Sequence, residues 1–164
     1  MMSENVLELE LQLALDESHL PTVTLPSEAQ ISNWASIALG SDRALAELVV
    51  RIVEPAESAA LNGRYRNKPS PTNVLSFPFE TPDGMEPLPL LGDLVICAAV
   101  VAREAAEQHK RWHAHWAHMI IHGVLHLRGY DHIEDDDAEA MEKLEIELLA
   151  SLGYNNPYIE NGTQ

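Results

Sequence analysis

The sequence predicts an α+β fold in which one domain holds a small mixed sheet of about four strands packed with about five helices. The length of 164 residues suits one domain with a sizeable core. Segments with two-residue alternation lie between segments of helical periodicity, and no internal repeat or linker divides the chain. We expect the domain to span residues 1–153 and residues 154–164 to form a loose, polar C-terminal tail.

The sequence marks the expected strands in different ways. Residues 6–13 carry leucine at each odd position and Glu or Gln between them, which is typical of a half-buried strand. Residues 48–53 and 93–97 are short, mainly apolar runs. Residues 75–79 form the remaining strand, and Pro78 places it at a sheet edge because proline cannot donate to a β-ladder.

The helices are marked by their ends as well as by their periodicity. Ser27 and Gln30 form a capping box, apolar residues follow at helical spacing, and Gly40 supplies a stop. Pro55 stands where a second helix can begin. The further helices are expected over residues 55–64, 98–108, 113–128 and 136–152.

Composition excludes several classes of protein. Hydrophobic residues make up 46% and charged residues 22%, so the chain is not disordered. No apolar run approaches the roughly 18 residues that a membrane span needs, and the N-terminal residues lack the pattern of a signal peptide. The lone Cys97 excludes a disulfide framework and a cysteine-based zinc site. We therefore expect a soluble, cytoplasmic protein.

The charge balance restricts any role with nucleic acid. The net charge is −16, from 26 acidic and 10 basic side chains. A general polyanion binder needs the opposite balance, because phosphate contacts require Lys and Arg. Any contact with nucleic acid must therefore depend on a local basic patch.

Three histidines have the spacing of a metal site. His122 and His126 lie four residues apart, so on a helix they face the same way and can bind one ion at about 2.0–2.1 Å each. Gly129 allows a turn that brings His132 back to the same point. His118 also precedes His122 by four residues, but at roughly 12 Å along the helix from His126 it cannot share an ion with that residue. We interpret His118 as a core residue or as support for the ligands.

This spacing is typical of a catalytic zinc, because three protein ligands leave the fourth position open for water. Zinc would lower the pKa of that water to about 7 and so provide a nucleophile. The pattern resembles the long motif of metzincin proteases, which carry a Glu general base directly after the first histidine. Here that residue is Gly123, which disfavours peptidase activity and leaves space beside the metal for a bulky or anionic substrate.

Two longer segments resemble the YbeY family of bacterial endoribonucleases that mature rRNA. One is the histidine segment, residues 122–132, and the other is Pro-Thr-Asn-Val-Leu-Ser-Phe-Pro at residues 71–78. Shorter matches also fit: Leu61-Asn62, Tyr65-Arg66, Gly92-Asp93, and Met141, Glu142, Glu145 and Gly153 in and after the last helix. The resemblance covers most of the chain, from roughly the first strand to Gly153.

The resemblance implies a zinc-dependent, single-strand-specific endoribonuclease that acts in 3′-end maturation of 16S rRNA and in ribosome quality control. It implies one zinc ion per chain on His122, His126 and His132, with Arg66 as a catalytic residue facing the metal. The implied partners are single-stranded RNA, the small ribosomal subunit and its assembly factors, and no DNA is expected.

The chemistry of Arg66 agrees with this role. Phosphodiester cleavage develops negative charge on nonbridging oxygens, which a fixed guanidinium can stabilise. Arg66 lies between Arg64 and Lys68 in the densest basic cluster of an acidic chain, although a lone surface arginine is often only solvated. No side chain is identified as the general base. Asp131 is a candidate partner for a ligand histidine and equally a turn-stabilising residue.

Two other functions stay open. One is a zinc metalloprotease-like hydrolase, favoured by the histidine spacing and disfavoured by Gly123. The other is a ribosome-assembly binding protein whose metal is mainly structural, which the net charge of −16 favours because affinity for naked RNA should be weak. Metal removal distinguishes them, because it unfolds a protein with structural zinc and inactivates an enzyme that stays folded.

Overall fold

The computed structural model describes residues 6–16, 24–40, 45–79, 84, 89–130 and 135–158. Within these residues the chain forms four strands and five helices, which confirms the predicted α+β class. In chain order they are β1 Val6–Ala14, α1 Glu28–Leu39, β2 Leu45–Val53, α2 Pro55–Arg66, β3 Val74–Pro78, β4 Leu90–Cys97, α3 Ala98–Glu107, α4 Trp112–Leu127 and α5 Asp135–Ser151.

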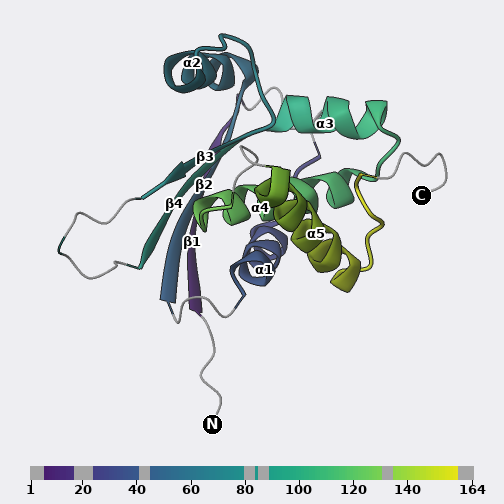
Figure 1. Ribbon diagram of the computed structural model, residues 1–164. Helices are drawn as coiled ribbons and strands as arrows, with labels where there is room; N and C mark the ends of the chain where they lie inside the picture. Colours follow the sequence, from purple (N-terminus) through teal and green to yellow (C-terminus); the bar gives the residue numbers. More distant parts are fainter. Residues whose placement is uncertain are drawn as a thin grey trace.

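The sheet is mixed, with the strand order β1-β2-β4-β3 (Figure 1). β1 pairs with β2, and β2 with β4, in parallel, whereas β3 runs antiparallel to β4. Pro78 is the last residue of β3 and pairs with Gly92, so the predicted edge position of this strand is confirmed.

The start of α1 agrees with the prediction from its capping residues, whereas β2 and β4 begin earlier than predicted because strand pairing extends them. Ser27 accepts a hydrogen bond from the Gln30 amide and the reciprocal bond is present, so the capping box of α1 is confirmed. β2 begins at Leu45 rather than at residue 48, because residues 45–47 pair with the start of β1. β4 likewise begins before residue 93, since Leu90 pairs with β2.

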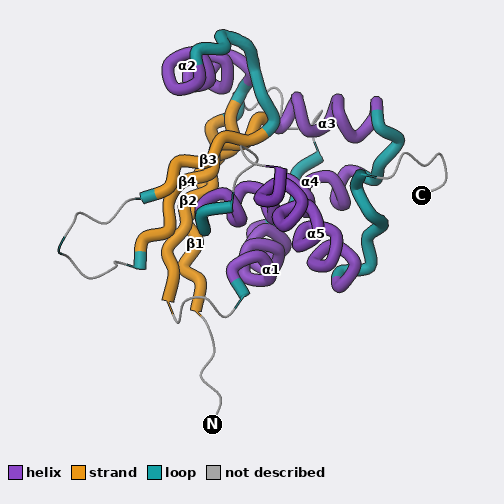
Figure 2. Tube along the Cα trace, in the orientation of Figure 1, coloured by secondary structure: helices purple, strands orange, loops and turns teal. Residues whose placement is uncertain are grey.

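The main core lies between one face of the sheet and α1, α4 and α5, which gather on the same side of the strand layer (Figure 2). α4 is its centre: from His115 to Leu127 each side chain is buried except those of His122 and His126. A smaller cluster on the other face includes Leu75 and Val95, with Leu61 of α2 packed against it. Among the described helices, none has the length and apolarity that a membrane crossing requires.

The chain after α5 packs against the domain as far as Tyr158, so the expectation of a loose tail is wrong for residues 154–158. The Lys110 ammonium donates to the carbonyl of Pro157 over 3.0 Å. The Tyr154 hydroxyl lies 3.2 Å from His113 Nδ1, and the Tyr158 hydroxyl donates to Glu145 of α5. Residues 154–158 pack against the domain because they include two tyrosines and a proline among the polar residues.

Candidate active site

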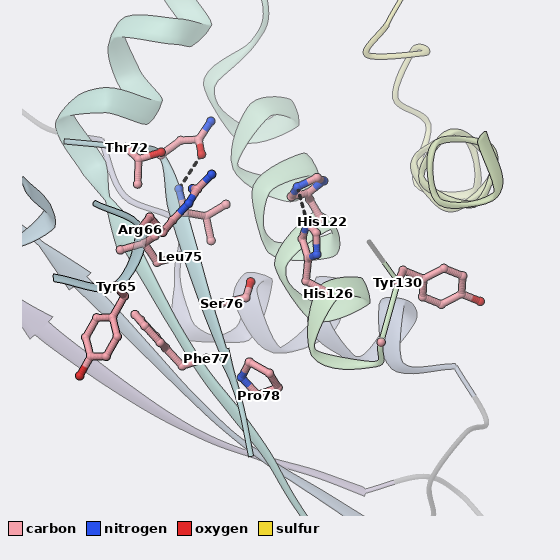
Figure 3. Close-up of a pocket in the computed structure, with 13 residues that line it drawn as sticks. Tyr65, Arg66, Thr72, Leu75, Ser76, Phe77, Pro78, His122, His126 and Tyr130 are labelled. Carbon is pink, nitrogen blue, oxygen red and sulfur yellow. Dashed lines mark hydrogen bonds between the residues drawn. The ribbon is translucent and has the colours of Figure 1, made fainter. Parts of the chain in front are cut away.

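His122 and His126 lie side by side on α4, and both side chains are partly exposed. Their Nε2 atoms are 3.1 Å apart, and the rings meet edge to face (Figure 3). Two imidazoles that bind one tetrahedral zinc at 2.0–2.1 Å would hold their nitrogens about 3.3 Å apart. The pair therefore fits two ligands of one ion without rearrangement of the helix. His132 and Asp131 lie outside the described residues.

A buried carboxylate lies behind the pair. Glu145 of α5 has no exposed surface, and its Oε2 lies 2.7 Å from His122 Nδ1 and 3.2 Å from His118 Nε2. Its Oε1 accepts a hydrogen bond from the Tyr158 hydroxyl. Burial alone would raise the pKa of Glu145, but the hydrogen bonds from His118 and His122 outweigh burial and hold the pKa well below its usual range.

The ionised carboxylate fixes the protons of both histidines. An ionised Glu only accepts hydrogen bonds, so His122 carries its proton at Nδ1 and His118 carries one at Nε2. Burial lowers the pKa of His118, which favours its neutral form. His122 then presents the lone pair of Nε2 toward His126. This is the carboxylate–histidine arrangement that orients ligands at many zinc sites.

The same carboxylate offers a second way to hold a cation. One nitrogen from each of His118 and His122 and one oxygen of Glu145 all lie within 4.8 Å of one another, so this group could bind a metal ion. The short contact of 2.7 Å between His122 Nδ1 and Glu145 Oε2 is instead that of a charge-assisted hydrogen bond. The geometry as it stands favours a metal on the Nε2 side of His122.

A cleft of about 790 Å³ opens between α4 and β3, and the two histidines form part of one wall. The opposite wall consists of β3 and the end of α2, which brings Arg66 and Tyr65 to the cleft (Figure 3). The Tyr65 ring, which is exposed, packs edge to face on Phe77 of β3 at 5.1 Å between centroids. Imidazole and guanidinium groups thus face one space.

Two buried polar side chains fix the loop that follows Arg66. α2 ends after this residue because Asn67 adopts a left-handed conformation and its amide bonds back to the Asn62 carbonyl. The Asn62 side chain donates to the carbonyl of Ser70 over 2.9 Å. Ser58 Oγ donates to the carbonyl and accepts from the amide of Thr72, at 3.1 and 2.9 Å. The loop between α2 and β3 is therefore fixed to the helix that carries the arginine.

Gly123 does not open space beside the metal, and that part of the sequence interpretation is wrong. A Cβ at this position would lie 2.7 Å from Leu94 Cδ2 of β4, inside the core. The glycine lets α4 approach the sheet closely, and the Ser76 hydroxyl of β3 donates to its carbonyl over 3.2 Å. A glutamate here would point into the sheet, away from the cleft.

Sequence reasoning missed the roles of Glu145 and Tyr158. Glu145 follows Met141 and precedes Leu149 by four residues each, and both are buried, so its position on the apolar face of a helix was a usable signal. A carboxylate on such a face needs buried donors. Tyr158 carried no comparable signal.

Comparison with known proteins adds two findings. The family model described as endoribonuclease YbeY matches residues 20–153. A solution structure of TM1509 from Thermotoga maritima, described as an NESGC target protein, matches with a TM-score of 0.49 and 23% sequence identity. The match covers 92% of this chain and 99% of that chain.

Proposed function

Because the chain belongs to the YbeY endoribonuclease family, we propose that it is a zinc-dependent, single-strand-specific endoribonuclease that acts in 3′-end maturation of small-subunit rRNA and in ribosome quality control. One observation carries the proposal: paired imidazoles and an arginine line the same cleft from opposite walls. The small ribosomal subunit and its assembly factors are the proposed partners. Residues 1–153 are the proposed catalytic domain.

His122, His126 and His132 are the proposed zinc ligands. The first two fit the ion in their present positions, since their Nε2 atoms converge to 3.1 Å. When bound, zinc supplies Lewis acidity and positive charge at the scissile phosphate. Glu145 keeps the proton of His122 on Nδ1, so that Nε2 stays available as a ligand atom.

Arg66 is the proposed catalytic residue of the opposite wall. Its guanidinium is always charged and can bind two nonbridging oxygens of one phosphate at once. The hydrogen bonds of Ser58 and Asn62 fix the loop that follows it, so the backbone that carries the arginine is fixed at the rim of the cleft before substrate arrives. Because the chain carries a net charge of −16, this local charge provides the attraction for RNA that the overall field opposes.

Cleavage of an end-labelled single-stranded RNA by zinc-loaded protein at low salt tests the proposal. We expect the parent to cut, His126→Ala to be inactive, and Arg66→Ala to be slower by about 10²–10³-fold, as for the loss of one transition-state donor. Arg64→Ala is the matched control, because Arg64 is exposed on the same helix turn and does not line the cleft. It should cut like the parent.

Four outcomes contradict the proposal. Equal cutting by parent and His126→Ala would show an activity independent of the pair. Equal losses of cleavage rate in Arg66→Ala and Arg64→Ala would show that Arg66 contributes only nonspecific positive charge. A folded, zinc-loaded parent that cuts no RNA would favour a binding protein in ribosome assembly, and cleavage of an unstructured peptide instead would favour a protease-like hydrolase.

A further inference from the structure

We propose that the C-terminal segment 154–158 is a working part of the metal site, in which Tyr158 positions the Glu145 carboxylate and Glu145 in turn orients His122. The inference rests on the proposed function, because it takes His122 as a zinc ligand. Both residues are positioning residues, since neither touches substrate. The argument starts from the carboxylate.

Glu145 is held by three donors on two oxygens. Oε2 accepts from His122 Nδ1 and from His118 Nε2, and Oε1 accepts from the Tyr158 hydroxyl. Among the described residues, Tyr158 supplies the donor to Oε1, so it sets how the carboxylate is turned about its terminal torsion. That torsion decides where Oε2 lies relative to His122. The orientation of His122 therefore depends on two successive hydrogen bonds, from Tyr158 to Glu145 and from His122 to Glu145.

The tail is attached well enough to do this. The Tyr154 amide bonds to the carbonyl of Leu149 at the end of α5, over 2.9 Å, and Lys110 holds Pro157 from the loop before α4. The Tyr158 amide donates to Asn156 Oδ1 over 2.8 Å, which turns the chain inward. The Tyr158 ring then packs edge to face on His118, with 5.5 Å between centroids. The hydroxyl also lies 3.3 Å from His118 Nε2, so His118 contacts both the ring and its oxygen.

Because Glu145 is buried, the loss of one of its hydrogen-bond donors should affect the position of the carboxylate. Glu145 has no exposed surface, so water cannot replace a missing donor at Oε1 without entering the core. Loss of the hydroxyl would leave Oε1 short of a partner and free the carboxylate to turn toward other donors. His122 would then lose part of the hydrogen bond that fixes its tautomer and ring orientation, and zinc affinity would fall.

Zinc affinity of full-length variants, measured by competition with a chromophoric chelator, tests the inference. We expect Glu145→Gln to bind zinc about 10–100-fold more weakly and Tyr158→Phe about 10-fold more weakly, because loss of such supporting partners has effects of this size. Tyr154→Phe is the matched control: it removes a tail hydroxyl that bonds to His113 and not to Glu145. It should bind zinc like the parent.

A purely structural tail predicts a different result. In that case Tyr158→Phe and Tyr154→Phe would lower the melting temperature of the zinc-free protein alike and leave zinc affinity unchanged, which would overturn the inference. Long-range ¹H–¹⁵N spectra give a second readout, independent of activity. The His122 proton should stay on Nδ1 in Tyr154→Phe and distribute over both nitrogens in Glu145→Gln.

These measurements separate this inference from the proposed function. If the zinc affinities follow the expected order and the parent cuts no RNA, the ribonuclease proposal fails and the positioning role stands. If His126→Ala keeps full zinc affinity while Glu145→Gln and His118→Ala lose binding altogether, the ion lies on His118, His122 and Glu145. The carboxylate would then be a ligand, and the positioning role would be refuted.

Discussion

α4 approaches β4 closely at Gly123, so we expect the effect of Gly123→Ala on stability to change sign when residue 94 changes. Gly123→Ala would place a Cβ 2.7 Å from Leu94 Cδ2 and 3.1 Å from its Cδ1, whereas carbon atoms prefer about 3.5–4.0 Å. Leu94 has no exposed surface and belongs to the main core cluster. Overpacking of this kind costs about 1–3 kcal/mol.

Two effects of the substitution oppose each other in the parent. Alanine stabilises a helix interior by about 1 kcal/mol relative to glycine. The clash outweighs this gain, so we expect Gly123→Ala to lower the free energy of unfolding by about 1 kcal/mol. In a Leu94→Ala background the side-chain atoms that cause the clash are absent. There the same substitution should raise the free energy of unfolding by about 1 kcal/mol.

Urea unfolding of the parent, both single variants and the double variant gives the coupling directly. Leu94→Ala alone should cost about 2–5 kcal/mol, because it leaves a cavity in the core. We expect a favourable coupling of about 2 kcal/mol between the two substitutions. Additive effects, with Gly123→Ala changing stability equally in both backgrounds, would refute the view that this glycine serves packing rather than substrate access.

Three further predictions follow from the described contacts. Burial alone would raise the pKa of Glu104, but hydrogen bonds from His115 and Asn73 outweigh burial and lower the pKa. The ionised carboxylate therefore stabilises the fold at pH values above its unfolded pKa near 4.5. This stabilisation is lost as the pH falls through the pKa of the folded state. The stability gap between the parent and Glu104→Gln, from unfolding curves, should be full at neutral pH and close in acid; a constant gap would contradict this. Tyr65→Ala should weaken binding of single-stranded RNA by about 1–3 kcal/mol in fluorescence anisotropy, as for loss of one stacking ring, while Tyr65→Phe keeps the affinity. Ser58→Ala should lower the free energy of unfolding by about 1–3 kcal/mol, because it leaves the partly buried amide and carbonyl of Thr72 without their partner; a neutral result would show that the loop is held otherwise.

Features set by neighbouring residues could be predicted from the sequence. The capping box of α1 and the pairing of His122 with His126 both depend on spacings of three or four residues, which a helix converts directly into contact. Pro78 marked an edge strand for a similarly local reason. Each of these depends on the covalent geometry of one element and not on the way elements meet.

Features set by packing between elements could not be predicted. Glu145 lies 23 residues from His122 along the chain and Tyr158 a further 13 residues on, so no local period connects them. Gly123 was interpreted through the metal because its sequence neighbours are histidines, whereas its spatial neighbour is Leu94. The resemblance to a family supplied Arg66, and the fold of the loop after α2 supplies the reason for its position.

The edge strand that forms one wall of the cleft also bears on self-association. An open strand edge offers unpaired amides and carbonyls to the edge of another molecule, which is a common route to aggregation. β3 is short, ends in proline, and has α4 beside it, with Ser76 bonded to the Gly123 carbonyl. A second sheet therefore finds only a five-residue edge, and the proline at its end cannot donate to a new ladder.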